Sequence, residues 1–145
     1  MEPKIRIILV SHGEQAKGML HSVQLLLGPQ KNMCAYGLQP EQTVTEFAEV
    51  LKKEVEQYGA ENILFMSELK MGSPFNAVVS LTRDYDIHHI TGVNLATLMT
   101  AVMERDDENI TVDEVCEAAM EAAQDSIADV RKMLQNDDME DEEEL

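Results

Sequence analysis

Residues 4–13 have the sequence KIRIILVSHG, an apolar and mostly β-branched run followed by Ser-His-Gly. Such a run is typical of a parallel strand that is buried on both faces. Gly13 permits a tight turn directly after it. We therefore expect a buried strand over residues 4–10 that ends in a turn carrying His12, and this arrangement is typical of α/β proteins.

Outward from this strand, helical and strand patterns alternate along the chain. Apolar spacing, Gly and Pro breaks and two capping boxes, Thr43 with Glu46 and Thr111 with Glu114, indicate where the elements begin and end. The expected elements are a helix over 16–27, a strand over 32–36, a helix over 43–58, a strand over 62–66, a helix opening at Ser73-Pro74 with a capping hydroxyl, a strand over 86–91, a short helix from Asn94, and a long final helix over 111–134. This alternation predicts a single three-layer, doubly wound α/β domain, with a mostly parallel sheet of about four strands flanked by helices.

The charge of the chain is strongly negative. It has 145 residues and a formal net charge of −17; seven of the last nine residues are acidic, and without them the remainder carries −10 (17 minus 7). An acidic surface repels the phosphates of nucleic acid, so we expect no nucleic-acid partner. We expect residues 1–135 to form one domain and residues 136–145 to be an acidic, disordered tail, or alternatively a segment that steers a basic partner.

Membrane insertion, secretion and metal binding find no support in the sequence. Apolar runs such as residues 7–10 are far shorter than the roughly 18 residues of a membrane span, and the N-terminus shows no secretion-signal pattern. Cys34 and Cys116 lack metal-ligand spacing and are expected to be free thiols in a reducing cytoplasm. His88 and His89 are adjacent on a predicted strand, so they point to opposite faces and cannot share one ion. We expect no metal and no cofactor.

Three polar loops follow predicted strands: residues 11–13, 67–73 and 92–94. The carboxyl ends of parallel strands lie at one edge of the sheet, where doubly wound folds bind ligands. The three loops are therefore expected to converge.

His12, Glu68 and the Gly72-Ser73 helix start are the candidate site residues. A carboxylate at Glu68 can fix the tautomer of His12 and leave its other ring nitrogen as a nucleophile. A helix start offers unpaired N–H groups to an anion. Each residue also has a plainer interpretation: His12 as a structural histidine, Glu68 as a solvent-exposed acid and Ser73 as an ordinary helix cap.

Other catalytic templates are missing from the sequence, including the Walker loop, G-x-G-x-x-G after the first strand and the G-x-S-x-G elbow. A histidine, a carboxylate and an anion-binding helix end suit a phosphohistidine.

Four motifs carry a family resemblance: residues 10–13 (VSHG), 72–77 (GSPFNA), 92–95 (GVNL) and 105–107 (RDD). In this order, between residue 5 and about residue 134, they resemble the IIA components of the mannose/fructose/sorbose class of the sugar phosphotransferase system (PTS). With this resemblance we expect the strand order 2-1-3-4. The family pattern implies a cytoplasmic phosphoryl carrier that accepts phosphate from phospho-HPr on His12 and passes it to a IIB component for sugar uptake.

The resemblance also implies roles for the residues around His12. Glu68 stands where the family commonly has an aspartate that orients the histidine, and the phosphate is expected at Gly13, Gly72 and Ser73. Residues of the partner surface or site lining are expected to be Lys70, Met71 and Asn94.

Partners and alternatives follow from the same resemblance. A homodimer is expected, but not by exchange of a C-terminal strand, because the end of the chain is acidic. Association with the membrane components IIC and IID would run through IIB. The alternatives are a phosphocarrier subunit of a dihydroxyacetone kinase system, a regulatory domain of the same fold without transfer activity, and an unrelated α/β enzyme.

Overall fold

The first strand lies in the interior of a four-stranded parallel sheet. In the computed structural model, which describes residues 2–141, β1 (Arg6–His12) pairs with β2 (Met33–Leu38) on one side and with β3 (Ile63–Ser67) on the other. The fourth strand, β4 (His88–Thr91), pairs with β3, and all pairs are parallel. The strand order β2-β1-β3-β4 confirms the expected order.

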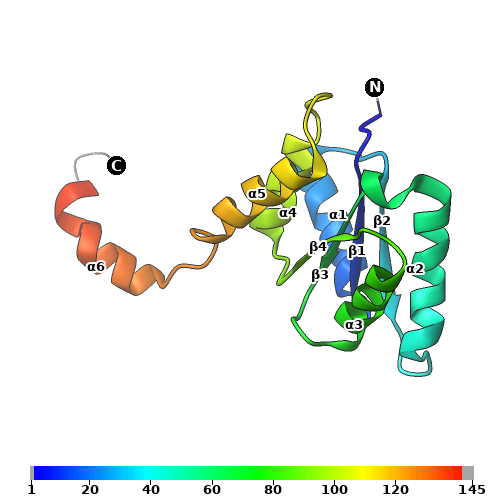
Figure 1. Cartoon of the computed structure of the whole chain (residues 1–145). Coiled ribbons are helices and arrows are strands. Elements are labelled where there is room, and N and C mark those ends of the chain that lie inside the picture. The colour runs from blue at the N-terminus through cyan, green and yellow to red at the C-terminus, as the bar shows by residue number, and fades with distance from the viewer. Residues whose placement is uncertain (1, 142–145) are drawn as a thin grey trace.

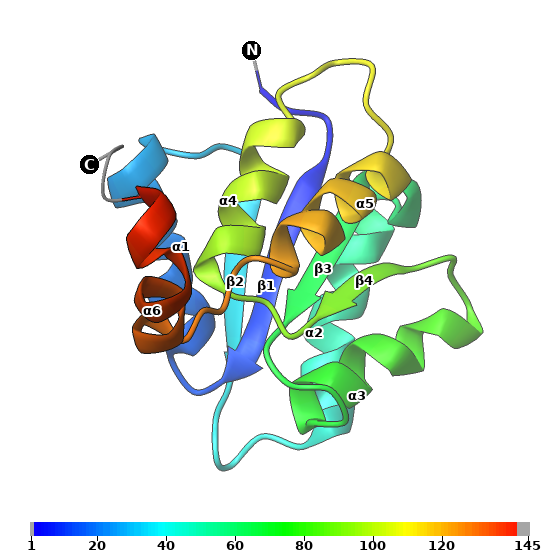
Figure 2. The ribbon, with the colours of Figure 1, turned by 90° about the vertical axis from the view of Figure 1, so that its left-hand side faces the viewer.

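Helices cover both faces of the sheet, as the sequence predicts. Helices α1, α4 and α5 lie on one face and α2 and α3 on the other (Figures 1 and 2). The helices are α1 (Gln15–Leu27), α2 (Val44–Tyr58), α3 (Ser73–Ser80), α4 (Leu95–Glu104), α5 (Val112–Ala123) and α6 (Val130–Asp141), with short 3₁₀ turns η1 (Ala60–Asn62) and η2 (Leu81–Arg83).

Alternation along β1 builds two separate cores. Ile7 and Leu9 pack in the cluster that includes residues of α1, α4 and α5, whereas Ile8 and Val10 pack in the cluster with α2 and α3. Because successive side chains of a strand point to opposite faces, a central strand with a layer of helices on each side is apolar along its buried stretch, here Ile7 to Val10.

Strands β1 and β2 extend two residues further than the sequence pattern indicates. Parallel pairing continues through Ser11 opposite Gly37 and His12 opposite Leu38. Backbone hydrogen bonds of the sheet therefore reach past the apolar run. His12 is the last residue of β1 and does not lie in the turn after it.

The expected long final helix is in fact two helices, α5 and α6. The Ser126 hydroxyl donates to the carbonyl of Ala123 at 2.8 Å and accepts from the side-chain amide of Asn94 at 2.8 Å. In a continuous helix the Ala123 carbonyl would instead accept from residue 127. Asp129 then starts α6 by accepting from the backbone amide of Lys132 at 3.2 Å.

Helix α6 projects away from the sheet (Figure 1). Its residues 130–136 are exposed, so the apolar stripe predicted to continue to Leu134 is not buried here. The helical backbone runs to Asp141, six residues into the segment expected to be disordered, and residues 142–145 lie outside the described residues. The domain boundary at residue 135 stays a prediction. Over residues 2–141, every helix is too short or too polar to cross a bilayer.

Candidate active site at the carboxyl ends of the strands

The turn that follows β1 is held from both sides. Ser11 is 1% exposed, and its hydroxyl accepts the backbone amide of Ala16 at 2.7 Å, which ties the strand end to α1. Gly13 has a φ of +54° and donates its amide to the carbonyl of Leu38 at 2.8 Å. That amide is therefore engaged within the protein, and Gly13 shapes the turn; its expected place beside the phosphate stays a prediction.

Glu68 holds His12 by two contacts. Its Oε1 accepts the backbone amide of His12 and also contacts the Nδ1 atom of the imidazole. The Glu68 side chain is 10% exposed, while that of His12 is 48% exposed. A carboxylate accepts hydrogen bonds, so Nδ1 carries the proton and Nε2 keeps its lone pair. His12 is the last residue of β1 and Glu68 directly follows β3. The two residues therefore lie on either side of the point where the strand order reverses.

Gly72 and Ser73 complete the wall beside the imidazole. A Cβ on Gly72 would lie 3.1 Å from Cε1 of His12, so only glycine fits without moving the ring. Gly72 is also the N-cap of α3, and Ser73 is the first helical residue, so the predicted capping hydroxyl is wrong. The backbone amide of Ser73 has no acceptor within its own helix, and its hydroxyl is free of the capping role.

An open depression of about 390 Å³ adjoins these residues. It is lined by His12, Gly13, Leu38, Gln39, Pro40, Gln42 and Ser73. The segment 38–42 was missed from the sequence because β2 was expected to end at residue 36. With the strand reaching Leu38, its loop opens at the same edge as His12.

Gly37 is a further residue that sequence reasoning missed. A Cβ there would lie 1.8 Å from the carbonyl oxygen of Gly13, so the turn can approach β2 only where no side chain exists. A glycine inside a strand pattern is the sequence signal for such a close backbone approach.

The loop between Glu68 and Gly72 is exposed. Leu69 is 60% exposed and Met71 74% exposed, and Lys70 between them is exposed as well. Met71 has a φ of +70°, an uncommon conformation for a residue other than glycine. This loop therefore presents two apolar side chains and one cation beside His12.

Asn94 does not line the depression. It caps α4 by accepting the backbone amide of Thr97 at 2.9 Å, and its amide group donates to Ser126. The loop that carries it touches the site indirectly, since the amide of Val93 donates to the carbonyl of Ser67 at 2.9 Å. The three predicted loops do meet at one edge, but only two of them flank His12.

The other histidines and the cysteines lie away from the depression. His21 is exposed on α1, His88 contacts Asp113 of α5 at 3.3 Å, and His89 faces α3. Both cysteines are free, and burial raises the pKa of Cys34 to about 12 and that of Cys116 to about 11. Among residues 2–141 no cluster of three or more metal-ligating side chains occurs.

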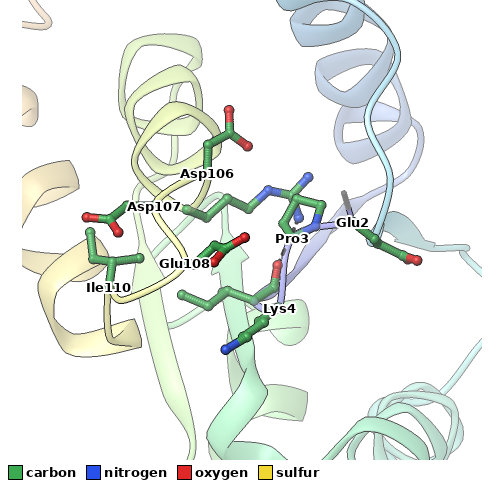
Figure 3. Close-up of a pocket in the computed structure, with 9 residues that line it drawn as sticks. Glu2, Pro3, Lys4, Asp106, Asp107, Glu108 and Ile110 are labelled. Carbon is green, nitrogen blue, oxygen red and sulfur yellow. Dashed lines mark hydrogen bonds between the residues drawn. The ribbon is translucent and has the colours of Figure 1, made fainter.

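The fourth sequence motif, residues 105–107, lies at the amino ends of the strands, opposite the candidate site. Arg105 is 2% exposed and binds backbone carbonyls near the start of β1 and before β2. A small pocket of about 70 Å³ lies beside it and is lined by Asp106, Asp107 and Glu108 on one side and by Pro3 and Lys4 on the other (Figure 3). This motif therefore supports the fold and not the candidate site.

Fold and site together define a small doubly wound α/β protein with a carboxylate-held histidine at its switch point. A family model described as "PTS system fructose IIA component" (EIIA-man) matches residues 6–120. This chain belongs to that family of phosphotransferase-system proteins, which confirms the resemblance seen in the sequence motifs.

Individual relatives agree with the family assignment. The chain is 31% identical over 132 residues to the PTS system mannose-specific EIIAB component of Escherichia coli (strain K12), covering 85% of this chain and 38% of that relative's length. It is 28% identical over 114 residues to the PTS system sorbose-specific EIIA component of Klebsiella pneumoniae, covering 78% and 82%. The crystal structure of phosphotransferase system component EIIA from Streptococcus agalactiae superposes with a TM-score of 0.81 at 28% identity, covering 88% of this chain and 98% of that one.

Proposed function

We propose that this protein carries a phosphoryl group on Nε2 of His12, accepting it from phospho-HPr and passing it to a IIB component during sugar uptake. The observation that carries the proposal is the double contact of the Glu68 carboxylate with the amide and Nδ1 of His12. That contact leaves Nε2 as the only ring nitrogen with a free lone pair, on a side chain that is half exposed.

The transfer step needs little beyond this pair. The Nε2 lone pair of His12 forms a bond to phosphorus, while the bond from phosphorus to its donor atom on HPr breaks and that atom keeps the electron pair. The imidazole becomes cationic as the new bond forms, and the negative charge of Glu68 stabilises it. The same steps in reverse, with IIB as acceptor, return His12 to its starting state.

Phosphate oxygens are proposed to bind at the start of α3. Gly72 lies against the His12 ring, and the next residue, Ser73, offers a backbone amide and a hydroxyl. The positive end of the helix dipole favours the anion there. Gly13 contributes the turn that leaves room for the group.

Partner proteins are proposed to dock on the exposed loop beside His12. Leu69 and Met71 supply apolar contacts and Lys70 a charge. Because both phospho-HPr and IIB must bring their reacting atoms to the same Nε2, they use this surface in turn. The chain spans 38% of the length of the mannose-specific EIIAB relative, so IIB as a partner is part of this proposal. Any association with IIC and IID at the membrane runs through IIB, and the protein itself works in the cytoplasm.

A homodimer is also proposed. Exposed apolar side chains gather on α5, α6 and the segment between them, including Met120, Ile127, Val130, Met133 and Leu134. Light scattering at micromolar concentration is expected to give twice the mass of the chain. A monomer mass would end the dimer proposal and leave the chemistry untouched.

Phosphorylation by the general PTS proteins tests the function. With phosphoenolpyruvate, enzyme I and HPr, the protein is expected to gain one acid-labile, base-stable phosphoryl group. His12→Ala should abolish the gain, whereas His21→Ala, a matched change of an exposed histidine on α1, should keep it. Phosphate uptake by the His12→Ala variant at full stoichiometry would disprove the mechanism.

Glu68→Gln should slow transfer without ending it. Glutamine keeps an acceptor oxygen but lacks the charge that stabilises the cationic ring, an effect of about 1 to 3 kcal/mol, or roughly 5- to 150-fold in rate. Ser73→Ala should cost less, since the backbone donors of α3 remain. Rapid-quench measurement of transfer from phospho-HPr compares the two variants.

A further inference from the structure

Three polar side chains meet at the carboxyl ends of β3 and β4, next to Glu68 of the candidate site. The hydroxyl of Ser67 lies 2.7 Å from Nε2 of His89 and 2.9 Å from the hydroxyl of Thr91. Ser67 is the last residue of β3 and is 0% exposed. A buried hydroxyl is costly unless it is hydrogen-bonded, so each of these contacts matters to the strand end.

Their position in the sheet places this trio, Ser67, His89 and Thr91, on the face that α3 covers. Alternation along β3 puts Ser67 on the same face as Phe65, which packs in the core with α2 and α3. The Ser67 hydroxyl donates to Thr91, so it is left to accept from His89, whose Nε2 then carries the proton.

His89 touches both chain segments that flank His12. It binds Ser67, the residue that directly precedes Glu68 in the chain. Its ring also packs against Phe75, with ring centroids 5.3 Å apart and planes inclined at 40°. Phe75 is the third residue of α3, two after Ser73. Strands β3 and β4 lie side by side, with α3 at the end of β3, in Figure 2.

We propose that His89 is a positioning residue for the phosphoryl-transfer site. By binding Ser67 and packing against Phe75, it fixes the Glu68 carboxylate relative to the start of α3, and so fixes the His12 imidazole between them. Loss of this support lets the Glu68 carboxylate move, and the Nδ1–H tautomer of His12 is then no longer enforced. The effect on transfer rate rests on the proposed function; the effect on the His12 tautomer does not.

The test uses the unphosphorylated full chain, labelled with ¹⁵N, and a second measurement of phosphoryl uptake from phospho-HPr. Long-range ¹H–¹⁵N correlations at about pH 7.5 report the tautomer of His12. The variants are His89→Leu, which removes the donor, and His89→Gln, whose amide nitrogen is the same number of bonds from the backbone as Nε2. His88→Leu is the matched control, because that neighbouring histidine contacts Asp113 of α5 on the opposite face.

The expected result is a His12 with protonated Nδ1 in the wild type, in His88→Leu and in His89→Gln, but a mixture of tautomers in His89→Leu. Phosphoryl uptake by His89→Leu should still reach one group per chain at a rate about 5- to 10-fold lower, the effect of one hydrogen bond, and His89→Gln should recover to within about 2-fold. Ser67→Ala should also give a mixture of His12 tautomers, and it changes the volume of the side chain less than His89→Leu does. It therefore tests the proposal if His89→Leu does not fold.

An unchanged His12 tautomer and rate in His89→Leu and Ser67→Ala would overturn the proposal, even if both variants lose stability. If no variant or wild type accepts phosphate from HPr, the proposed function fails, and the tautomer measurement still decides whether His89 positions His12.

Discussion

Replacing Arg105 with methionine should destabilise the protein without touching its chemistry. The guanidinium donates to the carbonyl oxygens of Ile5 at 2.9 Å, Asn32 at 2.7 Å and Lys31 at 2.7 Å, and to Oε1 of Gln30 at 3.2 Å. These acceptors lie before β1 and before β2, so one side chain from the end of α4 joins three segments at the edge opposite His12.

The magnitude follows from two opposing effects. Hydrogen bonds from a charged group contribute about 1.5 to 3 kcal/mol each, so the three carbonyl contacts together contribute about 5 to 9 kcal/mol. Burial opposes these contacts: it lowers the pKa of Arg105 from 12.5 to about 10, so the charged form is disfavoured relative to the neutral form by about 3 kcal/mol compared with water. The net loss in Arg105→Met is therefore expected to be about 2 to 6 kcal/mol. Arg105→Lys should recover only part of this lost stability. Lysine restores the positive charge, but its ammonium group cannot reach acceptors in several directions as the planar guanidinium does.

Urea unfolding followed by circular dichroism measures this difference. Arg83→Met, at an exposed arginine in η2, is the control and should change the free energy of unfolding by no more than about 0.5 kcal/mol. Folded Arg105→Met, assayed below its unfolding transition, should still take up one phosphoryl group. A loss smaller than about 1 kcal/mol would refute the reasoning, since it would mean that water replaces the arginine at no cost.

Three further outcomes are expected. Gly37→Ala should lower stability by at least about 2 kcal/mol and slow phosphoryl uptake, because its Cβ would lie 1.8 Å from the carbonyl oxygen of Gly13, whereas Gly18→Ala meets nothing within 4 Å and should be neutral or stabilising in thermal melts. Burial lowers the pKa of His89 from 6.5 to about 4, so the folded state favours the neutral ring; the associated stability is complete above about pH 6.5 and is lost as pH falls, by about 2 kcal/mol at about pH 5. His89→Gln should remove this part of the pH dependence of the urea midpoint, and equal dependence in both proteins would contradict the assignment. Deleting residues 136–145 should leave the melting temperature nearly unchanged, and a loss above about 2 kcal/mol would show that this acidic segment packs.

Much of the fold could be predicted from local sequence patterns. The run over residues 5–10 is apolar at every position but one and rich in β-branched residues, which is typical of a strand buried on both faces. Both predicted capping boxes, at Thr43 and at Thr111, are present because their hydrogen bonds join residues three apart. Where a boundary depended on distant contacts, the local pattern was wrong: Ser126 ends α5 with the help of Asn94, which is 32 residues away.

For the site, the sequence by itself determined the chemistry available: a histidine at a strand end, a carboxylate after a second strand and a Gly-Ser helix start, in the order typical of one family. Only the tertiary structure decided which of these groups touch. Parallel pairing of β1 with β3 brings Glu68 to the amide and Nδ1 of His12 across 56 residues of chain. The close approach of the Gly13 turn to β2 leaves no room for a side chain at Gly37, and a Cβ on Gly72 would crowd the His12 ring at 3.1 Å. Pairing of β3 with β4 brings Ser67 beside Thr91 and His89, which contact its buried hydroxyl. Such contacts depend on strand register and helix docking, which are set by the packing of the whole sheet and not by any segment alone.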